Sequence, residues 1–314
     1  MTGTGAMELY NRRGFIAGGL ALAASSAART AAGAWPVDIV YSRLEVGAAK
    51  PFSLFHISDT HLSLADEGDG PRLAELAKKR SDAFGGDQLG ALRDALAWAR
   101  ARRTDLIVHT GDLMDFQSGA NAAAAKEAFG EMSFGCIGNH EWTADPLAHG
   151  AKAPKTLPAA VSKAFPFDAE FDSHVAFGVN FVSMDDSHYR FTERQVERFE
   201  VEVGKGLPIV LLVHVPIYTP GTFEAALNFW GVAAEMIGVP SAELARYRSD
   251  RHRKEQLPDT TTAAFVERLR REPLLKAVLA GHEHFSVDDR FSETARQFVT
   301  GASFNRVARH FAIS

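Results

Sequence analysis

Cysteine, long apolar runs and a surplus of charge of one sign are all scarce in this sequence. Cys136 is the single cysteine among 314 residues, so no disulfide can form within the chain. Outside the N-terminal segment, no stretch approaches the roughly 18 consecutive apolar residues that cross a membrane. The net charge of −5 leaves no electrostatic footprint for bulk binding to nucleic acid or to an anionic membrane. These absences argue against a disulfide scaffold, a membrane-spanning mature chain and a nucleic-acid partner.

What is present is an ordinary globular composition, with 46% hydrophobic and 23% charged residues. Residues 36–314 are numerous enough to bury a large core as a single α/β domain, so a metal ion would not be needed to hold the fold together. Cys136 falls in an apolar stretch at 134–137. That context predicts a small buried side chain rather than a reactive thiol.

The first 35 residues have the composition of an export signal. The pair Arg12-Arg13 precedes Phe15 and a weakly apolar stretch, and small residues at 23–27 offer cleavage sites, although the sequence does not show whether cleavage occurs. The pair resembles a twin-arginine signal, and an ordinary secretory signal is the alternative. We therefore expect an exported protein, periplasmic or extracellular. The twin-arginine translocase would be a transient partner, carrying the chain already folded and loaded with metal.

Apolar runs typical of strands alternate with helical patterns along the rest of the chain. The run 52–58 is followed by a helical pattern at 88–103, where apolar residues recur at spacings of three and four, and then by a short run at 105–109. A strand, a helix and a strand in this order predict a right-handed crossover and a parallel pair. The continuous apolar runs 208–213 and 274–280 are typical of strands covered on both faces.

Metal-ligand residue types follow five of these strand-like runs. Oxygen and imidazole ligands delivered from several strand ends can converge on one point, where they can hold two metal ions. Glycine precedes three of the groups, where tight turns and close backbone approach are needed. Without a thiolate, the ligand types suit Fe, Mn or Zn and disfavour a structural cysteine site. The five groups are Asp59-x-His61, Gly111-Asp112, Gly138-Asn139-His140-Glu141, His214 and Gly281-His282-x-His284.

In this order, the five groups resemble the signature of the calcineurin-like metallophosphoesterase family, from about Phe52 to the C-terminus. Each group alone is a weak signal. The resemblance is specific because all five groups occur in this order, each at the end of a predicted strand. The resemblance implies an α/β fold, a four-layer α/β/β/α sandwich of two mixed sheets. The helical stretch between His214 and Gly281, at about 217–273, is expected to form a cap insertion within the domain at 36–314.

The resemblance also implies a ligand set of seven residues. Asp59, His61, Asp112 and His284 would bind one metal ion, and Asp112, Asn139, His214 and His282 would bind the other. Asp112 lies centrally among the groups, and a carboxylate can bridge two cations with its two oxygens. His140 would face the substrate as general acid or phosphate contact, and Glu141 would support the turn.

The activity implied is that of a dinuclear metal-dependent phosphoric ester hydrolase, with a small organic phosphomonoester or phosphodiester as substrate. Two metal ions would lower the pKa of a bridging water, the hydroxide would attack phosphorus in line, and His140 would assist the leaving alkoxide. Two alternatives stay open. One is a non-catalytic binding module on the same fold, and the other is metal-assisted hydrolysis of a non-phosphate bond.

Asp115 departs from the pattern of one branch of the family. Purple-type phosphatases place a tyrosine that binds ferric iron three residues after the aspartate of the Gly-Asp group, and here that position holds Asp115. A coloured ferric-phenolate site is therefore not expected, and a phosphodiesterase is favoured over a phosphomonoesterase. Asp115 is instead expected to orient a ligand histidine through a hydrogen bond.

Two residues outside the ligand set are candidates for substrate binding. Tyr218 lies four residues beyond His214 and is the best placed side chain if the cap selects the substrate. His188 lies in a polar loop and is the second candidate, with a plain loop position as its alternative. His56 and His109 also lie on strands, and because the ligand set is complete without them we expect core or supporting histidines.

Overall fold

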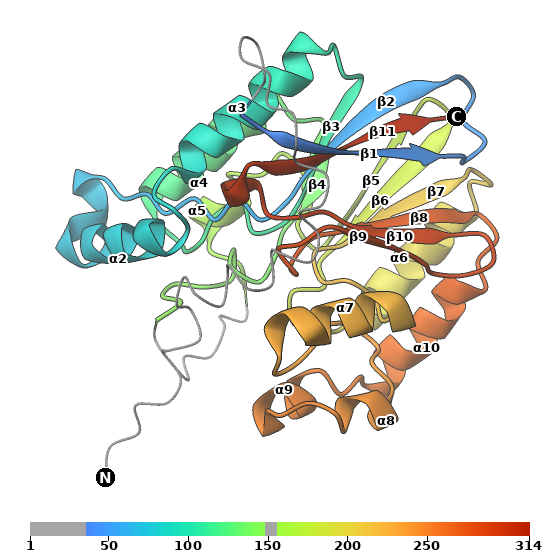
Figure 1. The fold of residues 1–314 in the computed structure, drawn as a ribbon. Helices are drawn as coiled ribbons and strands as arrows, with labels where there is room; N and C mark the ends of the chain where they lie inside the picture. Colours follow the sequence, from blue (N-terminus) through green and yellow to red (C-terminus); the bar gives the residue numbers. More distant parts are fainter. Residues whose placement is uncertain (1–35, 148–155) are drawn as a thin grey trace, which may run out of the picture. The chain divides into compact units, whose positions relative to one another are not determined.

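The computed structural model describes residues 36–147 and 156–314, so the expected export segment at 1–35 lies outside the described residues. Val37–Ser314 form one compact unit that contains two β-sheets and the helices that cover them (Figure 1). No helix among the described residues is long and apolar enough to cross a membrane.

The first sheet has five strands in the order β1-β11-β2-β3-β4. β11 runs parallel to β1 and antiparallel to β2, whereas β2, β3 and β4 are parallel to one another. The sheet is therefore mixed, and the strand that comes last in the sequence lies inside it. Its strands are β1 (Asp38–Leu44), β2 (Phe52–Ile57), β3 (Leu106–Thr110), β4 (Phe134–Cys136) and β11 (Val307–Ile313).

The second sheet has six strands in the order β5-β6-β7-β8-β10-β9. Its four central strands are parallel, and β5 and β9 are antiparallel at the two edges. The connection between β5 and β6 is made by Phe177 and Gly178, whose φ angles of 54° and 79° suit a two-residue hairpin turn. The strands are β5 (Phe171–Ala176), β6 (Val179–Met184), β7 (Ile209–Leu212), β8 (Leu275–Ala280), β9 (Val287–Arg290) and β10 (Arg296–Val299).

Helices occupy most of the connections between strands. Thr192 caps the start of α6 and forms a capping box with Gln195. The helices are α2 (Gly70–Ala83), α3 (Gln88–Ala101), α4 (Gly119–Ala128), α5 (Ala159–Ser162), α6 (Glu193–Val203), α7 (Pro220–Trp230), α8 (Ser241–Leu244), α9 (Asp250–Glu255) and α10 (Thr260–Arg270), with short 3₁₀ turns η2 (Glu67–Asp69) and η3 (Ser303–Asn305).

Three apolar clusters divide this unit into four layers. One cluster lies between the two sheets, a second joins α3, α4 and α5 to the outer face of the first sheet, and a third joins α6 and α10 to the outer face of the second. In β7, Val210 and Leu212 face the space between the sheets, while Ile209 and Leu211 face the helices. Burial on both faces explains the continuous apolar runs. The predicted α/β/β/α sandwich of two mixed sheets is confirmed.

The stretch predicted as a cap, at about 217–273, divides into two parts. α7, α8 and the chain between them share an apolar cluster of their own with Tyr247, which precedes α9; Phe223 and Leu244 belong to it, whereas α9 has no buried residue. α10 instead packs Phe265 and Leu269 into the layer on the second sheet, because it is the crossover helix between the parallel strands β7 and β8. We call the part from α7 to α9 the cap.

α2 is a helix that the sequence pattern did not predict. Of its 14 residues only Leu76 and Ala77 are buried, so its apolar periodicity is weak. The local signals are the η2 capping box at Asp66 and Asp69 and a proline in the first turn of the helix. α2 nevertheless carries a residue that reaches the candidate site.

Candidate metal centre

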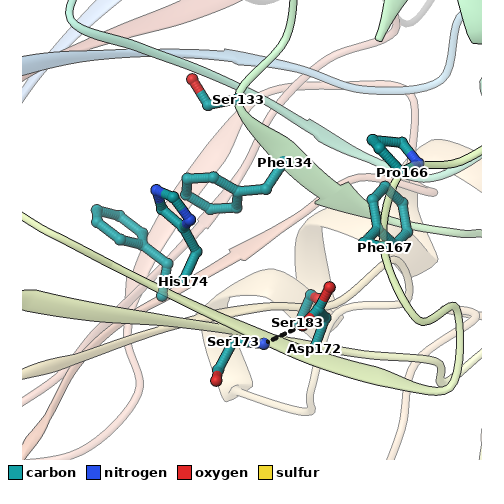
Figure 2. A pocket seen from close by; sticks show the side chains of 9 residues that line it. Ser133, Phe134, Pro166, Phe167, Asp172, Ser173, His174 and Ser183 are labelled. Atoms are coloured by element: carbon teal, nitrogen blue, oxygen red, sulfur yellow. Dashed lines mark hydrogen bonds between the residues drawn. The ribbon is translucent and has the colours of Figure 1, made fainter.

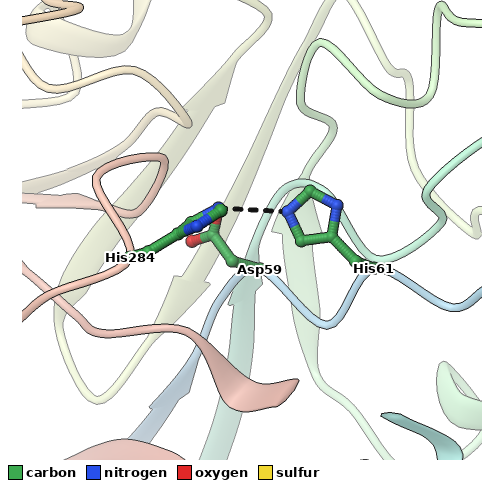
Figure 3. Close-up of side chains that lie close together, drawn as sticks. All are labelled: Asp59, His61 and His284. Carbon is green, nitrogen blue, oxygen red and sulfur yellow. Dashed lines mark hydrogen bonds and ion pairs between the residues drawn. The ribbon is translucent and has the colours of Figure 1, made fainter. Parts of the chain in front are cut away.

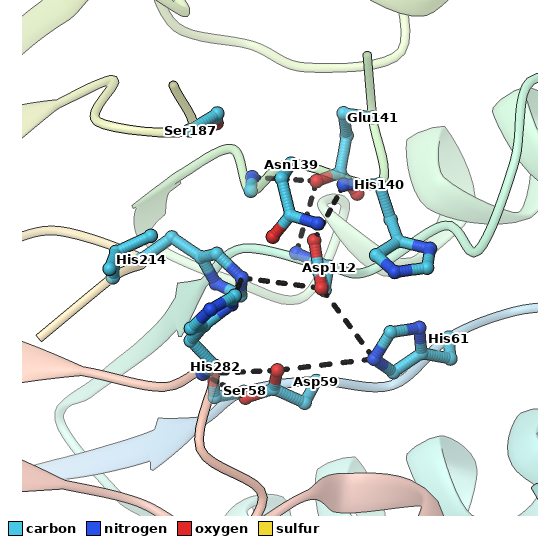
Figure 4. Close-up of polar contacts among 12 residues, drawn as sticks. Ser58, Asp59, His61, Asp112, Asn139, His140, Glu141, Ser187, His214 and His282 are labelled. Carbon is cyan, nitrogen blue, oxygen red and sulfur yellow. Dashed lines mark hydrogen bonds and ion pairs between the residues drawn. The ribbon is translucent and has the colours of Figure 1, made fainter. Parts of the chain in front are cut away.

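The predicted ligands all follow the carboxyl ends of parallel strands. Since β2, β3 and β4 belong to the first sheet and β7 and β8 to the second, the two sheets deliver side chains to one edge of the sandwich (Figure 4). Asp59 and His61 follow β2, Asp112 follows β3, Asn139 follows β4, His214 follows β7, and His282 and His284 follow β8.

One group of ligands consists of Asp59, His61 and His284, which we call the His61 half (Figure 3). Nε2 of His284 lies 3.1 Å from Nε2 of His61 and 3.4 Å from Oδ1 of Asp59. Burial and the charge of His140 lower the pKa of His61 to about 4. The His61 ring is therefore neutral at pH 7, which is the form that binds a metal ion.

The other group consists of Asp112, His214 and His282, which we call the His214 half (Figure 4). Nε2 of His214 lies 3.2 Å from Oδ2 of Asp112 and 3.1 Å from Nδ1 of His282. Burial lowers the pKa of His214, but the charges of Asp112 and Asp59 outweigh it and raise this pKa to about 10. The same negative potential would attract a metal cation.

Asp112 connects the two halves through one oxygen. Its Oδ2 lies 3.6 Å from Nε2 of His61 and 3.2 Å from Nε2 of His214. Its Oδ1 instead accepts the backbone N–H of His140 at 2.9 Å. The expectation that Asp112 bridges two cations with its two oxygens stays a prediction: Oδ2 faces both halves, and Oδ1 also accepts a backbone N–H.

Asn139 provides a test of whether these residues suit a metal. Its side-chain Oδ1 is buried and has no hydrogen-bond partner. An unpaired buried amide oxygen is costly unless a further group, such as a cation, binds it. The donor set therefore contains carboxylate, amide oxygen and imidazole but no thiolate, which fits Fe, Mn or Zn.

The backbone at five of the seven predicted ligands is in the left-handed region, which non-glycine residues seldom adopt. Such conformations cost about 1–3 kcal/mol each and cluster at functional sites. The φ angles are 52° at Asp59, 50° at His61, 54° at Asp112, 68° at His282 and 60° at His284. The chain at the strand ends is thus bent so that the side chains converge.

The glycines that precede three ligand groups are required by close approach. At Gly111, φ is 85°, and an added Cβ would lie 2.7 Å from the backbone nitrogen of Gly138. At Gly281, a Cβ would collide with the side chains of Ser58 and Asp59. Any larger residue would push the ligand loops apart.

Asp115 orients His61, as the sequence predicted. Its Oδ1 accepts from Nδ1 of His61 at 3.0 Å, which leaves Nε2 for a metal ion. Arg80 of α2 in turn donates to both oxygens of Asp115, at 2.6 and 2.8 Å. Sequence reasoning missed Arg80, because α2 was not predicted and no local motif marks an arginine that acts on a distant loop. Phe84, just after α2, stacks on the His61 ring with centroids 4.4 Å apart.

Glu141 supports the ligand turns, as expected. Its buried carboxylate accepts the backbone N–H groups of Asp112, Met114 and Gly138 at 3.0, 2.8 and 2.7 Å. Burial and the nearby charge of Asp112 raise the pKa of Glu141 to about 7. Glu141 therefore connects the turn after β3 to the turn after β4.

His140 lies against both halves of the centre. Its ring is 4.6 Å from that of His61, and together with His61 and Asp112 it forms a third close group of possible ligand atoms. Nδ1 contacts the backbone oxygen of Asp115 at 2.8 Å. Burial opposes protonation, but the charges of Asp112 and Asp115 raise the pKa of His140 to about 9.

The two predicted substrate-binding residues lie apart from this cluster. Tyr218 packs against Phe223 of the cap, with ring centroids 5.6 Å apart. His188 is exposed and lies 5.0 Å from the ring of Trp142. Among the described residues, no hydrogen bond, ion pair or ring contact joins either of them to a predicted ligand. Their roles stay predictions.

The two strand histidines and the cysteine are buried, as expected. His56 contacts the hydroxyls of Thr110 and Thr300 at 2.7 and 2.8 Å, and His109 contacts Thr60 at 3.0 Å. Cys136 lies in the apolar layer between the sheets. These residues belong to the core.

A cavity of about 130 Å³ lies elsewhere, beside β4, β5 and β6 (Figure 2). Phe134 and His174, whose rings are stacked with centroids 5.0 Å apart, are among its lining residues. None of the predicted site residues lines it, so it is separate from the candidate metal centre.

Comparisons with solved structures return several similar proteins. The chain is similar to a dimetal phosphatase from Danio rerio, with 15% identity and a TM-score of 0.45 over 82% of this chain and 89% of that one. It is similar to a purple acid phosphatase from yellow lupin (Lupinus luteus) seeds, with 12% identity and a TM-score of 0.45 over 81% of this chain and 44% of that one. It is also similar to a putative 5′-nucleotidase from Staphylococcus aureus, with 11% identity and a TM-score of 0.43 over 81% of this chain and 49% of that one. The chain spans less than half the length of the last two proteins.

Sequence comparison gives the assignment. No curated protein matches the chain significantly. The family model for calcineurin-like phosphoesterases matches residues 52–286, which is well over half of the chain and includes every predicted ligand. This chain therefore belongs to the calcineurin-like phosphoesterase family.

Proposed function

We propose that this protein is a dinuclear metal-dependent hydrolase of a small phosphoester. The observation that carries the proposal is the position of Asp112 Oδ2, which faces a histidine nitrogen of the His61 half at 3.6 Å and one of the His214 half at 3.2 Å. One anionic oxygen between two sets of neutral or anionic donors is suited to two cations.

The seven ligand residues would divide between two ions. Asp59, His61 and His284 would hold one ion, Asn139, His214 and His282 the other, and Asp112 would contact both. Bound at these positions, two ions of Fe, Mn or Zn would supply Lewis acidity for activating water and positive charge for neutralising phosphate. The buried oxygen of Asn139, which lacks a partner within the protein, supports its inclusion.

His140 would act on the leaving group. Asp115 fixes its ring through Nδ1, so the other ring nitrogen, Nε2, is the one left to carry a proton toward the substrate. The charges of Asp112 and Asp115 favour the protonated ring. A protonated imidazole held in this way is suited to donate a proton to a departing alkoxide.

We infer that the substrate is a phosphodiester in preference to a phosphomonoester. Asp115, which stands where purple-type phosphatases have a tyrosine, holds His61 and Arg80 and is not a phenolate ligand. The metal-free chain should be loaded with Mn, Fe or Zn separately and assayed with bis-(p-nitrophenyl) phosphate and p-nitrophenyl phosphate. Faster turnover of the diester is expected, and faster turnover of the monoester would reverse the preference.

The same assay, extended to a sulfate ester and a carboxylate ester, separates the alternatives. A chain that binds two metal ions but cleaves no ester would be a binding module. Cleavage of a sulfate or carboxylate ester without cleavage of a phosphoester would indicate a hydrolase of another bond. We also propose export through the segment at 1–35, which fractionation of cells that express an Arg12→Lys, Arg13→Lys variant would test: an unchanged exported pool would contradict the twin-arginine route.

A further inference from the structure

A carboxylate of the cap lies beside the predicted metal ligand His282. Glu235, which follows α7, places its Oε2 3.5 Å from Nε2 of His282. The hydroxyl of Tyr189, in the loop after β6, donates to Glu235 Oε2 at 2.6 Å and lies 3.3 Å from the same nitrogen of His282. We propose that Glu235 and Tyr189 are positioning residues that hold His282 for metal binding, a role that rests on the proposed function.

The two nitrogens of His282 face different surroundings. Nδ1 lies 3.1 Å from Nε2 of His214, on the side of the other predicted ligands, whereas Nε2 faces Tyr189 and Glu235. A neutral imidazole that binds a cation through Nδ1 carries its proton on Nε2, and an acceptor for this proton fixes the tautomer and the ring orientation. The tyrosine oxygen and the carboxylate supply that acceptor.

Glu235 itself is held firmly. Two residues later, the N–H of Ile237 donates to the backbone oxygen of Pro216 at 2.9 Å, so this segment is joined to the chain just after His214. One residue earlier, Tyr247 donates its hydroxyl to the backbone oxygen of Ala234 at 3.1 Å. Because hydrogen bonds hold the backbone on both sides of Glu235, its Cα has a fixed position and the carboxylate stays within reach of His282.

Two of the other ligand histidines, His214 and His61, take their acceptors from the sandwich. Nδ1 of His214 contacts the backbone oxygen of Thr110 at 2.8 Å, and Nδ1 of His61 contacts Asp115 at 3.0 Å. Of these three histidines, His282 is the one whose acceptors include a cap residue. Through Glu235 the cap therefore contributes to the candidate metal centre, and the metal ion of the His214 half should be the one that depends on this carboxylate.

Mn²⁺ binding to the metal-free full chain tests this role. Calorimetry would give the two dissociation constants, and electron paramagnetic resonance would distinguish a coupled pair of ions from isolated ions. In Glu235→Gln, one of the two Mn²⁺ dissociation constants should rise about 10- to 100-fold, with the other unchanged and the coupled signal replaced by that of isolated Mn²⁺. Glu224→Gln is the matched control, since Glu224 lies on α7 of the same cap and pairs with Arg246 at the surface.

If the Glu235→Gln variant binds both Mn²⁺ ions with the affinities of the wild-type chain and shows the spectrum of a coupled pair, the proposal is overturned. Tyr189→Phe is a second test, because it removes the hydroxyl and keeps the ring. It should raise the same Mn²⁺ dissociation constant as Glu235→Gln, and an unchanged Mn²⁺ dissociation constant would likewise count against the role. If Glu235→Gln does not fold, Tyr189→Phe decides. A wild-type chain that binds no Mn²⁺ would overturn the proposed function itself, whereas one that binds two ions without hydrolysis would overturn only the activity.

Discussion

The two halves of the metal centre are surrounded differently. Around the His61 half, aromatic rings predominate: Phe84 stacks on His61, and Trp230 and Phe304 lie edge-on to His284, with centroids 5.7 and 5.1 Å from its ring. These rings come from segments far apart in the sequence. They restrict the imidazoles by packing and keep water from one side of the ligands.

Around the His214 half, hydrogen-bond acceptors predominate. His214 is oriented by the backbone oxygen of Thr110, and His282 by Tyr189 with Glu235. The backbone N–H of His214 also donates to buried Asp186 at 3.0 Å. Orientation by hydrogen bonds depends on single atoms, so this half should be sensitive to isosteric changes that a packed ring would tolerate. The following variants test that difference.

Asp112→Asn should have the largest effect, because it removes the charged oxygen that the two halves share. We expect neither ion to bind tightly and a loss of several kcal/mol of transition-state stabilisation, or about 1000-fold in kcat/KM. Metal content and hydrolysis should be measured together. Asp82→Asn, at an exposed carboxylate of α2, is the control. Two tightly bound ions in Asp112→Asn would show that the halves are independent of this bridge.

His140→Ala should affect chemistry more than metal content, since His140 lies against both halves without being needed by either. Esters with basic alkoxide leaving groups should slow by about 100-fold or more, because they need a proton on departure. Activated aryl esters should slow far less. A series of leaving groups gives the dependence of kcat on leaving-group pKa, and equal losses across the series would remove the general-acid role.

Arg80→Gln should act on the His61 half alone. Without the guanidinium, Asp115 loses two hydrogen bonds and holds His61 less firmly, so one Mn²⁺ dissociation constant should rise about tenfold. Arg72→Gln on the same helix is the control, because that side chain is 75% exposed and pairs with Asp145. Equal weakening of both ions would mean that Arg80 supports the site as a whole.

Trp230→Phe should have the smallest effect on activity and a measurable effect on stability. It keeps an aromatic ring but removes the N–H that donates to Glu283 Oε2 at 2.6 Å. Glu283 is buried and its other oxygen already lacks a partner, so the free energy of unfolding should fall by about 1–3 kcal/mol. Urea unfolding measures this loss. Phe229→Leu, at a neighbouring ring that is 41% exposed, should change stability less.

The layers and the ligand convergence were predictable because they rest on local patterns. Apolar runs identify strands buried on both faces, and ligand types just after those strands must meet when the strands are parallel neighbours. Gly111 and Gly281 mark the close turns in the same local way.

The supporting residues were not predictable, because their roles come from contacts between distant segments. Arg80 acts on a residue 35 positions away, and Glu235 contacts Tyr189 across 46 positions. Neither lies in a motif. The single-oxygen contact of Asp112 depends likewise on a backbone N–H at His140, which composition does not reveal.

The place of β11 has a consequence for the order in which the protein can be assembled during synthesis. β1 pairs with β11, and β11 lies between β1 and β2, so the strand that leads into Asp59 keeps an unpaired edge until residues 307–313 have left the ribosome. At about 5–20 residues per second, that wait after β2 is on the order of ten to fifty seconds. During it, the apolar edge of β2 is open to pairing with another chain. β11 therefore closes an edge that the growing chain leaves open, as well as joining β1 to the sheet.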